Sequence, residues 1–138
     1  MNELFFDIET SALPENELLA MMPEFDAPKN LKDPDKIKAA IEEKKREWME
    51  NAALDPLTGQ VLAIGYIGIG ENEVSISGGS EEGVLAQFWT HLDWTTQENA
   101  DVKLVGFNIL AFDLPFLIKR SWRHGIKPPS WLRGGRYW

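Results

Sequence analysis

The chain has 138 residues, with 14 Lys and Arg against 22 Asp and Glu and a formal net charge of −8. Its 43% hydrophobic content, with 7 Phe, 6 Trp and 2 Tyr, is enough to build a core and excludes intrinsic disorder as the main state. The absence of cysteine excludes a disulfide scaffold and any thiolate zinc site. The first residues are acidic, and no apolar run approaches the ~20 residues that a membrane helix needs. We therefore expect one soluble, cytoplasmic domain with no membrane contact.

The charges are unevenly distributed along the chain. Residues 114–138 contain six basic side chains and no acid, whereas residues 1–113 contain all 22 acids. A negative total argues against a nucleic-acid partner, because phosphate binding normally shows as a basic surface. The basic segment weakens that argument, and it is open whether it forms a phosphate-binding face or only a basic helix end with a solvated tail.

The N-terminal part predicts a strand followed by a helical insertion. Residues 4–9 are apolar and aromatic enough for a short buried strand. Asp33 and Pro34 are typical of a helix start, and apolar residues at 3.6-residue spacing after them predict a helix of about 15–18 residues. Prolines and acids precede this helix, so we expect an insertion over about 11–55.

The middle of the chain predicts two strands and a helix. Residues 61–69 are apolar on both alternating faces, which is typical of a central strand, and residues 73–77 alternate as a neighbouring strand does. A helix is expected after the glycines at 78–79, with one apolar stripe buried. That stripe contains Val84, Leu85, Phe88, Trp89 and Leu92.

The C-terminal part predicts a fourth strand at 103–107 and a third helix that starts near Asp113 and ends at His124, before a glycine. This order of elements predicts an α/β fold with flanking helices around one mixed sheet. The side chains that the third helix should bury are Leu114, Leu117, Ile118 and Trp122.

Asp7 and Glu9 close the first predicted strand. Residues two apart on a strand share a face, with Cβ atoms roughly 6–7 Å apart. Carboxylates at that distance repel each other, and a bound cation or a raised pKa relieves the repulsion. A site of oxygen ligands alone favours Mg²⁺ or Mn²⁺ over zinc. Taken by itself, the pair is also consistent with two acids that simply face water.

Asn108 and Asp113 bracket a short apolar segment between a predicted strand and a predicted helix. Asp113 either caps that helix or, because loops at strand ends converge, adds a third carboxylate to the first two. Phe112 is either a core side chain or a ring offered to a nucleobase.

These two segments resemble known motifs. Residues 5–10 (FFDIET) resemble the first motif of the DEDD superfamily of 3′–5′ exonucleases, and residues 106–113 (GFNILAFD) resemble its second motif, N-x₃-F-D. The version is closest to the proofreading domains of family B DNA polymerases and to stand-alone phage and bacterial relatives. The order and spacing of the motifs make the combination more specific than either motif alone. The resemblance implies an RNase H-like fold.

The resemblance also implies hydrolysis of phosphodiester bonds at the 3′ end of single-stranded DNA by a two-metal mechanism, with DNA favoured over RNA. Asp7 would bridge two Mg²⁺ or Mn²⁺ ions, Glu9 would ligate the ion that holds the attacking water, and Asp113 would support the second ion. A replication or repair protein is the expected kind of partner. The residues that would hold the terminal nucleotides are Thr10, Asn108 and Phe112.

The third motif of that family, Y-x₃-D or H-x₃-D, is absent, and with it the fourth carboxylate. His124 has no Asp four residues further on, so we interpret it as a helix-end residue, and Tyr137 has only one residue after it. Large apolar residues, Trp131 and Trp138, lie close to the C-terminus. We therefore expect residues 1–138 to be a single exonuclease-like domain that forms the N-terminal portion of a longer exonuclease.

Other functions remain open at this stage. A catalytically incomplete nucleic-acid- or partner-binding fragment of the same fold would keep Asp7, Glu9 and Asp113 but bind metal weakly, with residues 114–138 contacting phosphate. In a phosphohydrolase of the haloacid-dehalogenase type the nucleophile also lies at the end of a buried strand, but that family requires D-x-D where this chain has D-x-E. No Walker-type glycine loop or G-x-S-x-G elbow supports an NTPase or a serine hydrolase.

Overall fold

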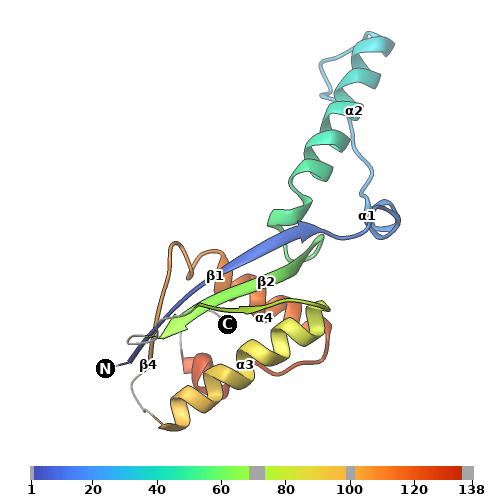
Figure 1. Cartoon of the computed structure of the whole chain (residues 1–138). Coiled ribbons are helices and arrows are strands. Elements are labelled where there is room, and N and C mark those ends of the chain that lie inside the picture. Colours follow the sequence, from blue (N-terminus) through green and yellow to red (C-terminus); the bar gives the residue numbers. More distant parts are fainter. Residues whose placement is uncertain (1, 69–73, 99–101, 135–138) are drawn as a thin grey trace.

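A four-stranded sheet forms the body of the computed structural model, which describes residues 2–68, 74–98 and 102–134 (Figure 1). The strands are β1 (Asn2–Ala12), β2 (Gly59–Gly68), β3 (Ser75–Ser77) and β4 (Val102–Val105). Their order in the sheet is β3-β2-β1-β4. β1 and β3 both pair with β2 in antiparallel fashion, whereas β1 and β4 are parallel. The expected α/β fold around one mixed sheet is confirmed.

β1 extends beyond the strand expected at 4–9 because both of its edges are paired. β4 pairs with its first residues on one side, and β2 pairs with it from Leu4 to Ala12 on the other. The register with β2 shifts once, between Glu9 and Thr10. The strands expected at 61–69 and 73–77 correspond to β2 and β3, although residues 69 and 73 lie outside the described residues.

Two helices, α3 (Glu81–Glu98) and α4 (Asp113–Arg123), cover one face of the sheet (Figure 1). Leu4, Phe6 and Ile8 of β1 point into this core, as the period-2 geometry of a strand requires. The apolar stripe expected on α3 is confirmed, since all five of its side chains are buried. From α4, the core receives Leu114, Phe116, Leu117 and Ile118.

The expected burial of Trp122 is wrong. Its side chain is 51% exposed, whereas the neighbouring Ser121 is fully buried. The indole Nε1 of Trp89 donates a hydrogen bond of 2.8 Å to the Ser121 hydroxyl. The small side chain takes the inward position of α4 because α3 fills that space with its own indole, and Trp122 lies on the outer side.

The expected helical insertion forms an arm that stands away from the sheet (Figure 1). The arm consists of α1 (Glu15–Met21), α2 (Pro34–Glu50) and the 3₁₀ turn η1 (Ala52–Leu54). The Asp33 carboxylate accepts the N–H of Asp35 at 3.0 Å, which confirms the predicted helix start. No residue of α2 is buried, and every one of them is described. The base of the arm has its own small cluster, formed by Leu13, Leu18 and Ala52.

The described part of the chain ends in a second 3₁₀ turn, η2 (Ser130–Gly134). Trp131 lies within it and is exposed, while Tyr137 and Trp138 lie outside the described residues. None of the helices in the described ranges combines the length and the apolar composition that a bilayer span requires.

Candidate active site at the edge of the first strand

Asp7 and Glu9 project from the face of β1 that the helices leave uncovered. Both side chains are exposed, whereas the alternating neighbours Phe6 and Ile8 are buried in the core. Strand geometry therefore places the two carboxylates on one face, in agreement with the expectation from their spacing.

Asp113 is the first residue of α4 and is only 3% exposed. Its carboxylate accepts hydrogen bonds from its own backbone N–H and from the backbone N–H of Ile8. The residue that precedes the helix, Phe112, makes no side-chain cap, and the Asp113 carboxylate itself accepts the N–H of the first helical residue. Through its second hydrogen bond, from Ile8, the same carboxylate joins the start of α4 to the middle of β1.

Asp113 lies within the range of the charge of Asp7. Burial raises the pKa of Asp113, and the negative charge of Asp7 raises it further, against the opposing effect of the two backbone hydrogen bonds. Within the described ranges, no salt bridge involves Asp7, Glu9 or Asp113. The two neighbouring carboxylates are therefore not neutralised by a described basic side chain.

The donor chemistry at this place fits a hard divalent cation, since it consists of carboxylate oxygens alone. Among residues 2–68, 74–98 and 102–134, however, no three His, Cys, Asp or Glu side chains are close enough together to hold a metal ion. Asp7 and Asp113 are the two carboxylates that the fold brings together. Glu9 lies two residues further along β1, on the same exposed face.

The loop between β4 and α4 is held against β1 by its backbone. A Cβ atom at Gly106 would lie 2.6 Å from the carbonyl oxygen of Phe6 and nearer still to the side chain of Ile109, so only glycine fits. Asn108 has a φ of 55°, in the left-handed region that Asn enters more readily than most residues. Its carbonyl accepts the N–H of Phe112 at 3.0 Å.

Two of the residues expected to hold nucleotides are also engaged within the protein. Phe112 is half-buried against the core, and its ring centroid lies 5.5 Å from that of Phe116. The hydroxyl of Thr10 donates a hydrogen bond of 2.8 Å to the carbonyl of Ala53 and so ties β1 to η1. Phe112 thus packs against the core with part of its ring and keeps part of its surface exposed.

A buried ionic cluster, which the sequence did not reveal, joins α3 to α4. Glu81 and Arg120 have side chains only 8% and 2% exposed, and two guanidinium nitrogens donate to the Glu81 carboxylate at 2.8 and 2.6 Å. His124 Nε2 lies 2.6 Å from the same carboxylate, so its interpretation as a plain helix-end residue was incomplete. The backbone N–H of Val61 donates to Glu81 at 2.8 Å. Glu81 and Arg120 are 39 residues apart, and no local pattern marks them as partners.

The pKa of Glu81 results from two opposing effects. Burial alone raises it, but the hydrogen bonds from Arg120, His124 and the backbone of Val61, together with the positive charge of Arg120, hold it below its ordinary value. The carboxylate therefore stays ionised beside the buried guanidinium.

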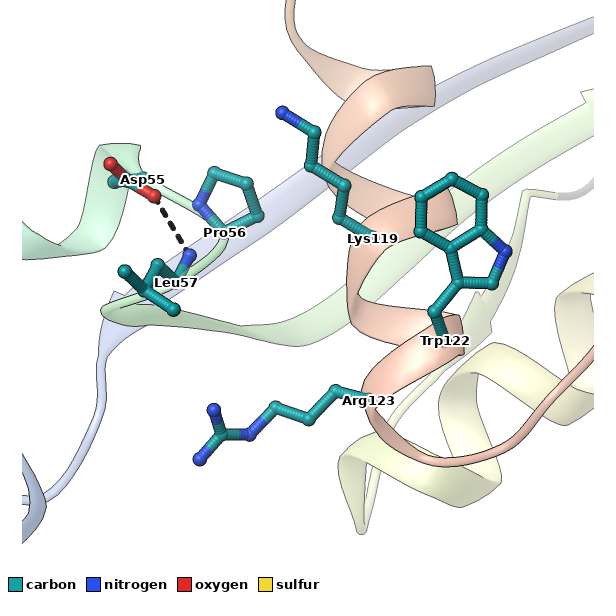
Figure 2. Close-up of a pocket in the computed structure, with 6 residues that line it drawn as sticks. All are labelled: Asp55, Pro56, Leu57, Lys119, Trp122 and Arg123. Carbon is teal, nitrogen blue, oxygen red and sulfur yellow. Dashed lines mark hydrogen bonds between the residues drawn. The ribbon is translucent and has the colours of Figure 1, made fainter. Parts of the chain in front are cut away.

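The basic C-terminal segment is divided between core and surface. Arg120 is buried and paired, so it has no access to a phosphate. Lys119 and Arg123 extend from the same side of α4 along a hollow of about 440 Å³, which Trp122 and the turn at 55–57 complete (Figure 2). The guanidinium of Arg123 also lies 3.8 Å from the Glu17 carboxylate, with both side chains partly exposed.

Comparison with solved structures identifies the class of fold. The chain is similar to the family B DNA polymerase from the hyperthermophilic archaeon Pyrobaculum calidifontis, with a TM-score of 0.50 and 21% sequence identity. The match covers 99% of this chain but 12% of that chain, so the present chain spans a small part of the polymerase's length. At this identity the likeness shows the fold alone. No curated protein matches the chain.

The family is given by the sequence match over residues 59–137, which is more than half of the chain. These residues match the family of predicted 3′-5′ exonucleases related to the exonuclease domain of PolB. The chain belongs to this family. The relation to the DEDD exonucleases of family B polymerases, inferred from residues 5–10 and 106–113, is confirmed.

Proposed function

We propose that the chain is a metal-dependent 3′–5′ exonuclease that hydrolyses phosphodiester bonds at the 3′ end of single-stranded DNA, in preference to RNA. The family supplies the class of reaction. The observation that carries the proposal is the placement of Asp113, whose buried carboxylate accepts the backbone N–H of Ile8, the residue after Asp7; burial and then the charge of Asp7 raise its pKa. Two carboxylates held together in this way favour a divalent cation between them.

Asp7 and Asp113 would hold Mg²⁺ or Mn²⁺, and Glu9 would join them from the same exposed face of β1. Two such ions supply an activated water and stabilise the leaving 3′ oxygen. The burial of Asp113 and its hydrogen bond from the backbone of Ile8 fix one carboxylate before the ion arrives, which lowers the ordering cost of binding. The proposed neighbours of the terminal nucleotides are Thr10, Asn108 and Phe112.

A second candidate function is a nucleic-acid- or partner-binding form of the same fold without full activity. It is favoured because the described ranges contain no three clustered metal-holding side chains. In this form the phosphate contact would fall to Lys119 and Arg123, since Arg120 is buried. A replication or repair protein is the proposed partner for either function.

The first prediction tests the proposed activity directly. We expect the chain with Mn²⁺ to shorten a 5′-labelled single-stranded DNA from its 3′ end, followed on a sequencing gel. Asp7→Asn keeps the side-chain shape but removes the charge, and we expect it to slow the reaction by roughly 100-fold or more because a metal ligand is lost.

Asp26→Asn, which changes an exposed acid of the arm, is the matched control and should cut at the wild-type rate. If the wild-type chain binds the oligonucleotide without shortening it, and Asp7→Asn binds equally well, the binding function replaces the exonuclease.

A further inference from the structure

The positive charge of the chain is concentrated near its C-terminus. Residues 1–14 and 55–113 contain a single Lys or Arg, Lys103, and residues 15–54 contain seven against ten Asp and Glu. Residues 114–138 contain six and no acid. Because a polyanion is attracted to clustered cations, we expect the chain to meet one through this last segment.

One side of α4 is left uncovered by the rest of the protein. Pro115, Lys119 and Trp122 follow each other at spacings of four and three residues, which places them on one face of the helix. Lys119 and Trp122 are exposed, and so is Arg123, one turn after Lys119. The axis of an ideal helix rises about 14 Å from Asp113 to Trp122. The uncovered side therefore leads from the end of α4 that carries a proposed metal ligand to its other end.

The far end of this side lines the hollow of about 440 Å³ between α4 and the turn at 55–57 (Figure 2). The indole of Trp122 is 51% exposed, and Leu57 of the turn is 62% exposed. The amine of Lys119 and the guanidinium of Arg123 extend from α4 toward the turn. An exposed aromatic ring between cations is the combination that holds a single-stranded nucleic acid, since a base stacks on the ring while phosphates meet the cations.

Two carboxylates also lie at the hollow, and neither blocks it. Asp55 accepts the N–H of Leu57 at 2.8 Å, so it serves the turn itself. Glu17 of α1 lies 3.8 Å from the guanidinium of Arg123, and the two side chains are 46% and 43% exposed. Ion pairs this exposed are weak, so a phosphate can replace Glu17 at Arg123.

We propose that this hollow binds an internal stretch of single-stranded DNA, with a base stacked on Trp122 and phosphates at Lys119 and Arg123. The simultaneous placement of the 3′ end at Asp7 and Asp113 rests on the proposed function. At 3.4 Å for each stacked nucleotide, the rise of about 14 Å along α4 corresponds to about four nucleotides between the two places. Stacking on a single ring tolerates all sequences, so the hollow would hold any strand.

The test measures the fluorescence anisotropy of a 5′-labelled oligothymidylate of about twelve nucleotides, titrated in EDTA so that the proposed metal site does not contribute. We expect Trp122→Ala to weaken binding roughly 5- to 100-fold and Trp122→Phe to retain most of it, because a smaller ring still stacks. With Mn²⁺, Trp122→Ala should raise KM for this strand toward the value for a strand of about four nucleotides, which is too short to reach both places.

The double variant Lys119→Gln/Arg123→Gln tests the phosphate contacts. Each contact with a single strand contributes about 0.7 to the slope of log affinity against log salt, so the slope should fall by about 1.4. A purely structural role of the two side chains would leave the slope unchanged. Lys38→Gln removes an exposed cation of α2, and Trp94→Ala removes an exposed ring of α3. Both are matched controls and should bind as the wild type does.

Glu17→Gln gives an effect in the opposite direction. It removes the carboxylate that competes with phosphate for Arg123, and we expect it to strengthen binding roughly 1.5- to 5-fold. Weaker binding by this variant would contradict the assignment of Arg123. Loss of binding in both Trp122→Ala and Trp122→Phe would indicate a disturbed helix and would overturn the stacking role.

The outcomes for the hollow and for the exonuclease are separable. If the wild type shortens DNA and the Trp122 and Lys119/Arg123 variants bind the strand equally well, the role of the hollow is overturned and the exonuclease stands. If binding depends on these residues but nothing is shortened, the hollow stands and the exonuclease fails. If an oligoglutamate displaces the strand as well as unlabelled oligothymidylate does, the hollow is a docking site for acidic proteins and the proposal is overturned.

Discussion

Asp113 lies in an environment that disfavours its own ionised form. Burial and the charge of Asp7 raise its pKa, so this group stabilises the fold most when it is protonated and less as the pH rises through the raised pKa. A carboxylate whose ionised form lowers the stability of the fold is expected at a functional site, where the chemistry requires the charge. The same charge repulsion is what a bound divalent cation would remove.

Asp113→Asn should therefore separate stability from function. We expect its melting temperature without metal to equal or exceed that of the wild type by about 1–4 °C, because the repulsion from Asp7 disappears while an amide oxygen still accepts the N–H of Ile8. Mn²⁺ should raise the melting temperature of the wild type and not that of Asp113→Asn. Circular dichroism melts with and without Mn²⁺ measure both effects. Equal stabilisation of both proteins by Mn²⁺ would show that Asp113 is not a metal ligand.

At the level of elements, α4 is held near both of its ends by polar side chains. Its start is joined to β1 through Asp113, and its last turns are joined to α3 through the pairing of Arg120 and His124 with Glu81. Arg120 also donates to the carbonyl of Pro56 at 3.1 Å. A buried ion pair of this kind adds little net stability, but removing one partner leaves an uncompensated charge. We infer that the cluster orients α4 and hence Asp113.

Glu81→Gln should destabilise the protein by about 3 kcal/mol in urea unfolding, because Arg120 stays buried without an anion. Glu43→Ala removes one of the two exposed carboxylate partners of Arg46, and it should leave the stability nearly unchanged. The pKa of Glu81 is held below its ordinary value of 4.5, so its stabilising contribution is present above that pH and is lost as the pH falls through the lowered pKa. Below pH 4.5 the wild type should therefore lose stability more steeply than Glu81→Gln. Parallel pH dependences for the two proteins would contradict this assignment.

At the level of the whole molecule, the buried hydrophobic side chains of the described residues form two separate clusters. The larger one lies between the sheet and the helices α3 and α4, and the smaller one lies at the base of the arm. The helix α2 contributes no buried residue to either cluster. The arm should therefore open locally at a lower free energy than the body.

A proline in the middle of α2 tests this independence. Glu42→Pro costs roughly 3 kcal/mol of helix stability because it removes a backbone donor and clashes with the preceding turn. We expect hydrogen exchange to accelerate over residues 34–50, while the amides of β1 and β2 keep their protection. Glu42→Ala is the matched control and should leave both regions unchanged. Loss of protection in β1 would show that the arm and the body fold as one unit.

Several features of the fold followed from local patterns. Alternation along residues 4–9 placed Asp7 and Glu9 on one face, because successive side chains of a strand point in opposite directions. Asp33 and Pro34 marked the start of α2, because a carboxylate can accept a free N–H there and proline has none to lose. These expectations depend on backbone geometry within a few residues, which the sequence contains in full.

The sequence by itself determined the order of the elements, the carboxylates of the two motifs and the family relation that they indicate. The tertiary structure alone decided which of these groups meet. Asp113 contacts the backbone of Ile8 across about a hundred residues of chain, and Glu81 pairs with Arg120 across 39. Burial is set by the elements that pack together, so only the assembled sheet and helices turned Trp122 outward and left the ring of Phe107 in solvent.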